Sequence, residues 1–142
     1  MNQIGDSHRP ATSSKVLVVD DDANVLDTFA RMLLWRGHDV LMALTVEAAL
    51  RELPNCQLDV VLLDLRMPKR DGLAFLRELR AREKQHHIPV AIITGDYFID
   101  DTTACAIREL DADLYFKPVL LEELVDITEE LLQRAAARIP NE

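Results

Sequence analysis

Short apolar runs alternate along this chain with longer segments of helical periodicity, and this alternation restricts the fold more than any other feature. The continuous runs are Val16–Val19, Val60–Leu63, Val90–Ile93 and Leu114–Phe116. Runs of this length are typical of strands that are buried on both faces, as in parallel sheets covered by helices. The alternation therefore predicts an α/β fold in which strands and helices succeed one another.

Five strands and five helices are expected. The strands are Val16–Val19, Asp39–Ala43, Val60–Leu63, Pro89–Ile93 and Leu114–Phe116. The helices are Val25–Trp35, Val46–Leu53, Leu73–Lys84, Asp101–Leu110 and Leu121–Ala137. Asp22 and Thr45 are suited to cap the first two helices. This order predicts a (βα)5 doubly wound parallel five-stranded sheet with right-handed crossovers.

The helix faces predict which side chains are buried. Trp35 and the leucine-rich helix faces are assigned to the core, whereas the charges between Arg77 and Lys84 are assigned to a solvated face. His86 and His87 are expected in a solvated loop, and the acidic residues of the last helix on its outer face.

Length and charge exclude several function classes. A chain of 142 residues predicts a single domain, at residues 15–137, between a flexible tail at 1–14 and a C-terminal tail at 138–142. The net charge of −9 argues against direct binding of nucleic acid. No apolar run is long enough to span a membrane, and the two cysteines do not suggest a disulfide framework. We expect a cytoplasmic protein that contacts no membrane.

Polar residues follow four of the predicted strands directly. They are Asp20 and Asp21, Asp64, Thr94 and Lys117. In a parallel sheet the carboxyl ends of the strands meet in one crevice, so these side chains are expected to converge. Two carboxylates about 4 Å apart repel by roughly 4 kcal/mol, and a bound cation relieves this repulsion. Oxygen ligands of this kind suit Mg²⁺, and the sequence has no histidine or cysteine cluster for zinc.

The predicted set of groups suits phosphoryl transfer. A carboxylate beside Mg²⁺ can attack phosphorus and form an aspartyl phosphate. Lys117 adds a positive charge, Thr94 adds a hydroxyl, and Gly95 leaves room for the backbone to approach a phosphoryl group. Each residue alone has an ordinary explanation as a cap, a turn or a surface charge. The prediction depends on their occurrence together and in this order.

Four motifs in order carry a family resemblance. They are Val18-Val19-Asp20-Asp21-Asp22, Asp64-Leu65-Arg66-Met67-Pro68 with Gly72 four residues later, Ile93-Thr94-Gly95, and Phe116-Lys117-Pro118. At these residues the chain resembles the receiver domain of two-component response regulators, the CheY-like domains. The resemblance covers Lys15 to Ala137 and implies a flavodoxin-like sheet with strand order 2-1-3-4-5.

The resemblance also implies roles for single residues. Asp64 matches the phosphoacceptor. Asp21 matches a direct Mg²⁺ ligand, Asp20 a ligand acting through water, and Asp64 and the backbone carbonyl of Arg66 are the remaining protein ligands. Thr94 matches the switch hydroxyl, beside Gly95.

Further implied roles lie around the fifth strand. Lys117 matches the lysine that pairs with the phosphoryl group, and Lys117–Pro118 matches a cis peptide bond. The family usually has an aromatic residue three positions before this lysine, where this chain has Leu114; Tyr115 is expected on the other face of the strand. Arg66 and Asp96 stand at positions that tune the lifetime of the phosphoryl group.

The resemblance implies a signalling protein that is not a turnover enzyme, although it can lose its phosphoryl group by hydrolysis. Its partners would be a sensor histidine kinase or phosphotransfer protein, and an output protein or domain that contacts the last two helices and the fifth strand. It also allows a phosphorylation-dependent homodimer. The chain is read as a stand-alone receiver or as the N-terminal fragment of a longer regulator.

Other classes of function stay open at this point. A pseudo-receiver would act as a scaffold without phosphorylation, and Leu114 keeps that hypothesis in view. A Mg²⁺-dependent phosphatase of the haloacid-dehalogenase type would need an aspartate at position 66, which is arginine here. A Rossmann nucleotide-binding domain is disfavoured because none of the four glycines follows the first strand.

Overall fold

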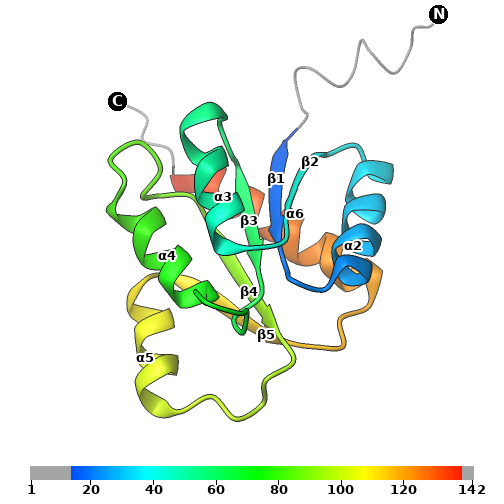
Figure 1. Ribbon diagram of the computed structural model, residues 1–142. Coiled ribbons are helices and arrows are strands. Elements are labelled where there is room, and N and C mark those ends of the chain that lie inside the picture. Colours follow the sequence, from blue (N-terminus) through cyan, green and yellow to red (C-terminus); the bar gives the residue numbers. More distant parts are fainter. Residues whose placement is uncertain (1–13, 139–142) are drawn as a thin grey trace, which may run out of the picture.

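The structure is a computed structural model that describes residues 14–138 (Figure 1). Its strands are β1 (Lys15–Val19), β2 (Asp39–Ala43), β3 (Val60–Leu63), β4 (Val90–Thr94) and β5 (Ala112–Phe116). Its helices are α2 (Ala23–Trp35), α3 (Val46–Glu52), the 3-10 turn η1 (Leu53–Asn55), α4 (Gly72–Ala81), α5 (Asp101–Glu109) and α6 (Leu121–Arg138).

The strands form one parallel sheet in the order β2-β1-β3-β4-β5, as expected. Helices α2 and α6 cover one face, and α3, α4 and α5 cover the other (Figure 1). Each face has its own core. Phe75 and Ile107 are buried on one side of the sheet, and Phe29 and Leu124 on the other. Because both faces are covered, the central strands are continuous apolar runs apart from Lys15 at the start of β1 and Thr94 at the end of β4, and the prediction of a doubly wound α/β fold is confirmed.

Capping side chains fix where the helices begin. The carboxylate of Asp22 accepts hydrogen bonds from the backbone N–H groups of residues 24 and 25, and the Thr45 hydroxyl accepts one from residue 48. Both predicted caps are therefore confirmed. Asp71 and Asp100 cap α4 and α5 in the same way. Each cap satisfies a backbone donor that has no partner within the helix.

The predicted helix over 73–84 is too long at its C-terminal end. Helix α4 ends at Ala81 because the backbone of Arg82 is extended, with ψ of 131°. The chain then turns back toward β4, and the Arg80 guanidinium holds this turn by donating to the carbonyl oxygens of His86 and Ile88, at 2.9 and 2.6 Å. The assignment of Arg80 to a solvated face was therefore wrong, whereas His86 and His87 are exposed as expected.

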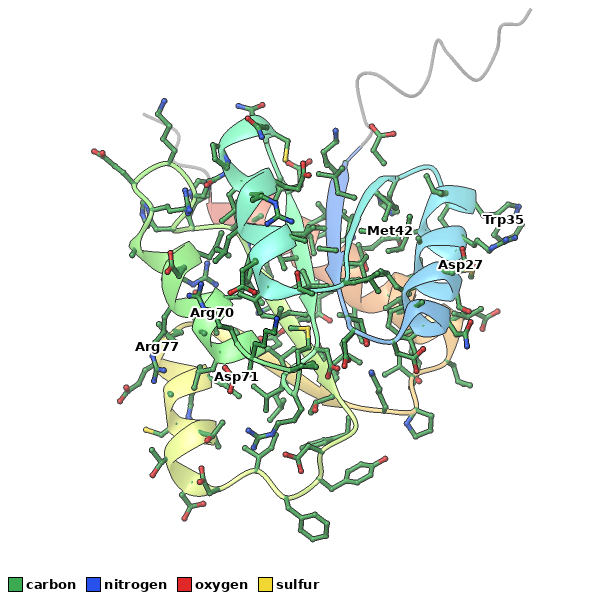
Figure 2. All side chains as sticks on the ribbon, viewed as in Figure 1. Asp27, Trp35, Met42, Arg70, Asp71 and Arg77 are labelled. Carbon is green, nitrogen blue, oxygen red and sulfur yellow. The ribbon has the colours of Figure 1, made fainter. Side chains whose placement is uncertain are left out.

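The assignment of Trp35 to the core was also wrong. Its side chain is 78% exposed and projects outward from the end of α2 (Figure 2). The buried stripe of α2 consists of Leu26, Phe29, Ala30 and Leu33. A residue two positions after Leu33 lies about 200° around the helix, so it faces away from the sheet.

Smaller differences of one or two residues concern the ends of several elements. Strand β5 begins two residues before the predicted start, directly after Asp111, which has φ of 60°. The predicted tails, residues 1–14 and 138–142, lie outside the described residues except for Ser14 and Arg138, and Arg138 ends α6. Within the described part of the chain, no helix is long and apolar enough to cross a membrane.

Candidate functional site

The sheet brings the four strand-end motifs to one edge. Asp20 follows β1, Asp64 follows β3, Thr94 ends β4 and Lys117 follows β5. Backbone hydrogen bonds extend the pairing to these residues: the Asp64 N–H donates to the Val19 carbonyl at 2.9 Å, and the Lys117 N–H donates to the Thr94 carbonyl at 2.8 Å. The ladder therefore fixes the positions from which these side chains project.

Three carboxylates meet at this edge. Oxygen atoms of Asp20, Asp21 and Asp64 lie within 4.8 Å of one another. Asp20 and Asp64 are buried, with 3% and 8% of their surface exposed, whereas Asp21 is exposed. Close carboxylates in a partly buried site repel one another strongly.

Lys117 supplies one positive charge to this cluster. Its Nζ lies 2.9 Å from Asp20 Oδ2 and 3.9 Å from Asp64 Oδ2. Asp20 Oδ1 also accepts a hydrogen bond from the Asp22 N–H at 2.9 Å. Both oxygens of Asp20 thus have close donors, whereas the ammonium lies farther from Asp64.

This arrangement disfavours the ionised form of Asp64. Its burial, and secondly the negative charge of Asp20, raise the pKa of Asp64 from its ordinary value of 3.8 to about 6, although Lys117 opposes this shift. A further positive charge at the site would stabilise the ionised form of Asp64.

The donor set fits a hard divalent cation. Three carboxylates face one ammonium, so the cluster has an excess of negative charge, and its ligand atoms are all oxygens. Mg²⁺ prefers such ligands and retains water molecules in its remaining positions. Asp20, Asp21 and Asp64 are the residues that would hold it. The predicted contribution of the Arg66 carbonyl stays a prediction.

Thr94 closes the site on the β4 side. Its side chain is fully buried, and its Oγ1 accepts a hydrogen bond from the Asp96 N–H at 3.1 Å. A Cβ atom at the neighbouring Gly95 would lie 3.9 Å from Cδ of Lys117, which is an ordinary contact. The hydroxyl is thus held by the loop that follows its own strand.

Arg66 and Asp96 join the two loops that flank the site. Arg66 Nε donates to Asp96 Oδ2 at 2.6 Å, and the other oxygen of Asp96 accepts from the Phe98 N–H at 3.0 Å. The bond to Arg66 lowers the pKa of Asp96. The structure therefore brings this predicted pair into direct contact, and its effect on phosphoryl lifetime stays a prediction.

The end of β5 matches the expectation for its backbone and faces. The Lys117–Pro118 peptide bond is cis. Leu114 packs against the core beneath α3, α4 and α5, whereas Tyr115 packs against the core beneath α2 and α6. The two side chains therefore lie on opposite faces of β5, as the pattern predicted.

Sequence reasoning missed Tyr97. Its ring stacks on Phe116 with ring centres 5.5 Å apart, and its hydroxyl donates to the backbone carbonyl of Lys117. Tyr97 thus ties the loop after Thr94 to the strand end that carries Lys117. The only signal in the sequence is its place three residues after Thr94, and no motif distinguishes it.

Gly72 stands out in the sequence only as part of a motif, yet its position is constrained by the backbone of Asp64 and Leu65. A Cβ atom there would lie 2.3 Å from the Asp64 carbonyl oxygen and 3.1 Å from Leu65 Cα. Its N–H also donates to the Leu65 carbonyl at 2.8 Å. The first residue of α4 therefore packs directly on the backbone of Asp64.

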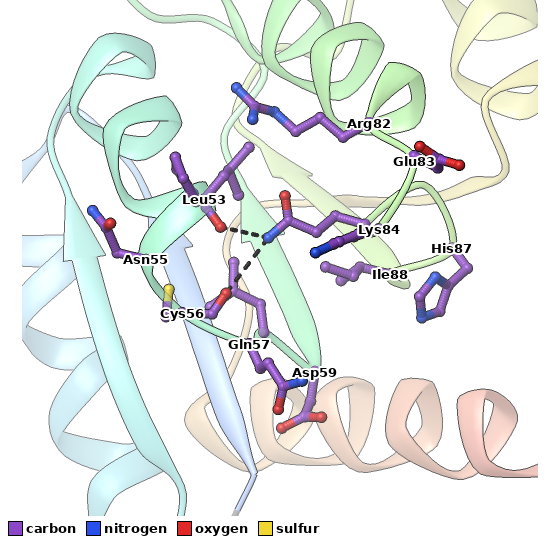
Figure 3. Close-up of a pocket in the computed structure, with 13 residues that line it drawn as sticks. Leu53, Asn55, Cys56, Gln57, Asp59, Arg82, Glu83, Lys84, His87 and Ile88 are labelled. Atoms are coloured by element: carbon purple, nitrogen blue, oxygen red, sulfur yellow. Dashed lines mark hydrogen bonds between the residues drawn. The ribbon is translucent and has the colours of Figure 1, made fainter.

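A groove lies at the end of the sheet opposite to this site (Figure 3). Its volume is about 870 Å³, and it separates residues 53–59 from residues 82–88. The side-chain nitrogen of Gln85 crosses it and donates to the Leu53 carbonyl at 2.6 Å. None of the predicted site residues lines this groove.

Comparison with known proteins now identifies the family. The family model described as "Response regulator receiver domain" matches residues 16–129. The chain belongs to the response regulator receiver domain family. Receiver domains are parts of two-component signalling proteins, so the resemblance and the assignment to this signalling class are confirmed.

Curated relatives are longer than this receiver domain. The transcriptional regulatory protein PrrA of Mycobacterium leprae is 37% identical over 127 residues, which cover 89% of this chain and 53% of PrrA. AruR of Pseudomonas aeruginosa, also a transcriptional regulatory protein, is 36% identical over 84% of this chain and 50% of its own length. The chain thus spans about half the length of the curated relatives it matches.

Solved receiver domains share the fold. A receiver domain from Clostridium thermocellum is 30% identical to this chain, with a TM-score of 0.78. The match covers 89% of this chain and 99% of the Clostridium chain. A CheY-like domain from Methanospirillum hungatei has a TM-score of 0.82 at 23% identity, with 90% and 100% covered. At that identity the likeness shows the fold alone.

Proposed function

We propose that this receiver domain accepts a phosphoryl group on Asp64 from a sensor histidine kinase or a phosphotransfer protein. The observation that carries the proposal is the position of Asp64, a buried carboxylate at a strand end, close to two other aspartates and to Lys117. A structural role alone does not account for this placement, because the site raises the free energy of ionised Asp64.

The proposed reaction is a direct transfer between two side chains. A carboxylate oxygen of Asp64 attacks the phosphorus of a phosphohistidine, the phosphorus–nitrogen bond breaks, and the histidine nitrogen leaves with the bond's electron pair and takes up a proton. The product is an aspartyl phosphate. The ammonium of Lys117 is placed to pair with the phosphoryl oxygens.

Asp20, Asp21 and Asp64 would hold Mg²⁺ at this site. When bound, the ion would orient the phosphoryl group and offset the charge that gathers on its oxygens. The carboxylates of Asp20 and Asp21 do not attack phosphorus in this proposal; they bind and orient. Hydrolysis of the aspartyl phosphate would return the domain to its starting state.

Thr94 is the proposed switch. Its hydroxyl bonds to the Asp96 N–H, and a phosphoryl group on Asp64 would offer it a stronger, charged acceptor. Exchange of one partner for the other would change the loop after β4, and the surface of α5, β5 and α6 would respond by a shift in populations. An output protein or output domain would bind that surface; the greater length of PrrA, a transcriptional regulatory protein, is consistent with an output domain outside the receiver.

The proposal is tested by the intact mass of the full chain after incubation with acetyl phosphate. We expect a Mg²⁺-dependent gain of one phosphoryl group in the wild type and in Asp27→Ala, a control that removes an exposed aspartate on α2. The gain should be absent from Asp64→Ala. A folded wild-type protein that never gains mass, with acetyl phosphate or with a phosphorylated histidine kinase, would contradict the proposal.

The same samples separate the other hypotheses. A scaffold that works without phosphorylation would bind its partner equally well as wild type and as Asp64→Ala. A phosphatase would release phosphate continuously from small phosphate esters, beyond one equivalent per chain.

A further inference from the structure

The groove at the end of the sheet remote from Asp64 shares no residue with the phosphoacceptor site. One wall is formed by residues 53–59, which lead from α3 to β3, and the other by residues 82–88, which lead from α4 to β4 (Figure 3). Its volume of about 870 Å³ lies within the range of roughly 300–1,000 Å³ that is usual for small-molecule sites. The groove is therefore large enough for a small organic ligand.

Hydrogen bonds hold the two walls of this groove together. The side-chain nitrogen of Gln85 donates to the carbonyl of Leu53 at 2.6 Å and to that of Cys56 at 3.5 Å (Figure 3). Arg80 anchors the second wall by donating to the carbonyl of Ile88 at 2.6 Å. The side chains of Leu53 and Ile88 are buried. The groove is thus formed before a ligand arrives, which reduces the conformational entropy that binding would cost.

Arg82 is the side chain that points most directly to the charge of a ligand. It directly follows α4, lines the groove and is partly buried. Its Nε is buried and has no hydrogen-bond partner among the described residues. A buried donor without a partner is unfavourable, so an acceptor supplied by a ligand would be favoured. A carboxylate or a phosphate suits this position, because a guanidinium can donate two parallel hydrogen bonds to either group.

Lys84 adds a second positive charge to the same wall. It is exposed, and its side chain extends from the 82–88 wall toward the opposite wall (Figure 3). Within residues 14–138, neither Lys84 nor the Arg82 guanidinium has a carboxylate as an ion-pair partner. Both cations are therefore available to an anion.

Two carboxylates also line the groove, but both are directed elsewhere. Asp59 lies at the end remote from Arg82, and its Oδ2 accepts a hydrogen bond from the Lys15 N–H at 2.8 Å (Figure 3). The carboxylate of Glu83 points away from the opposite wall (Figure 3). The part of the groove beside Arg82 and Lys84 is thus positive, on a chain whose net charge is −9. Such a local charge would attract a small anion to this part of the surface.

Amide side chains indicate the remainder of the ligand. Asn55 and Gln57 line the first wall, and Gln85 lines the second. An amide both donates and accepts hydrogen bonds, so these side chains suit hydroxyl groups better than hydrocarbon.

We propose that this groove binds a small hydroxylated organic anion. Its carboxylate or phosphate group would accept hydrogen bonds from Arg82 and Lys84, and its hydroxyl groups would contact Asn55 and Gln57. The inference goes beyond the proposed function and does not depend on it, because the phosphoacceptor lies at the other end of the sheet.

The test follows backbone amide chemical shifts of the full chain during titration with three hydroxylated probes and inorganic phosphate. Gluconate carries a carboxylate, glucose phosphate carries a phosphate ester, and glucose is their neutral counterpart. A chelator is present throughout, so that no metal ion draws a phosphate to Asp64. At least one organic anion should shift the amides of residues 53–59 and 82–88 and bind at least about 3-fold more tightly than inorganic phosphate, whereas glucose should not bind. The tighter of the two organic anions tells a phosphate site from a carboxylate site.

Matched variants assign the binding to the two cations. Arg82→Gln should weaken binding about 10-fold, because it removes charge-assisted hydrogen bonds. Lys84→Gln, at an exposed position where the fold is not at risk, should weaken it about 3-fold. The control Arg77→Gln removes one positive charge from an exposed position on α4 outside the groove and should change binding by less than about 2-fold. Asp64→Ala should bind like the wild type, so a failure of the phosphorylation proposal leaves this result unaffected.

Four results would overturn the inference. The first two are the absence of amide shifts in the groove with both organic anions, and equal binding of glucose. The third is equal weakening by Arg77→Gln and Lys84→Gln, which would mean that the probes respond to net charge. The fourth is inorganic phosphate that binds as tightly as the organic anions, which would mean that the hydroxylated body makes no contact.

Discussion

Substitution of Gly72 by alanine tests whether the backbone of Asp64 is held in place by the start of α4. The added Cβ atom would lie 2.3 Å from the Asp64 carbonyl oxygen and 3.2 Å from its carbonyl carbon. Both neighbours are backbone atoms, so no side chain can rotate out of the way. The N–H of Gly72, bonded to the Leu65 carbonyl, holds the two segments together from the other direction.

The magnitude follows from this overlap. Cβ atoms in proteins essentially never approach another heavy atom closer than 3.0 Å, so α4 and the Asp64 segment must separate by at least about 0.7 Å. Overpacking of this kind costs about 1–3 kcal/mol, which exceeds the small gain from placing alanine in a helix. A displacement approaching 1 Å at a reacting carboxylate slows the reaction by up to about 100-fold.

The stability assay compares Gly72→Ala with Gly95→Ala, whose Cβ would make only an ordinary contact with Lys117. Urea unfolding should give a lower free energy of unfolding for Gly72→Ala alone. Phosphorylation of Gly72→Ala by acetyl phosphate should be about 10- to 100-fold slower than that of the wild type. Equal stability and equal rates for Gly72→Ala and the wild type would show that the start of α4 does not hold the Asp64 backbone in place.

Three further predictions concern Asp64, Arg80 and Trp35. Because the pKa of Asp64 is raised to about 6, its ionisation lowers stability as the pH rises from about 4 to 6. With a chelator present to remove metal ions, Asp64→Asn should therefore raise the free energy of unfolding by up to about 3 kcal/mol near pH 8 and by little near pH 4. A difference between the two proteins that does not change with pH would contradict the raised pKa of Asp64. Arg80 donates to four backbone carbonyls, so Arg80→Ala should lower the free energy of unfolding by about 2–4 kcal/mol in urea titrations. The control Arg77→Ala, at an exposed position on α4, should change it by less than about 0.5 kcal/mol. Trp35→Ala should cost less than about 1 kcal/mol, and the wild-type fluorescence should be quenched readily by added iodide; strong protection from the quencher would contradict its exposure.

Periodicity predicted the elements well where burial is uniform. Strand β3 is apolar at every position, and its neighbours β1 and β4 are apolar except at one end, because helices cover both faces of the sheet; such runs are distinct in the sequence. Caps were equally clear, because an aspartate or threonine directly before a helical segment has a local role. The end of α4 was predicted less well because the turn after it is held by side-chain bonds from Arg80 to the carbonyls of His86 and Ile88, for which the sequence has no signal. Trp35 was misplaced because the assignment followed its hydrophobicity, although its helical spacing from Leu33 puts it on the side of α2 that faces away from the sheet.

Some residues of the candidate site could be predicted from the sequence and others could not. Asp20, Asp64, Thr94 and Lys117 could be predicted to meet, since each directly follows or ends a strand and parallel strands end at one edge. Tyr97 could not, because its importance comes from a ring stack and a hydrogen bond across two loops. The contact of Arg66 with Asp96 and the raised pKa of Asp64 also depend on distances and burial that have no local signal.

The order of strands and helices, the family, and the residue types that gather at the strand ends can thus be predicted from the amino-acid sequence. These follow from hydrophobic periodicity and from motifs that are read over a few consecutive residues. Three features appear only in the folded molecule: the distances from Lys117 to its aspartates, the close packing of Gly72 on Asp64, and the groove between residues 53–59 and residues 82–88. The physical reason is that electrostatic energy, packing and groove shape depend on distances between residues far apart in the chain, and those distances are set only when the whole sheet and its helices are assembled.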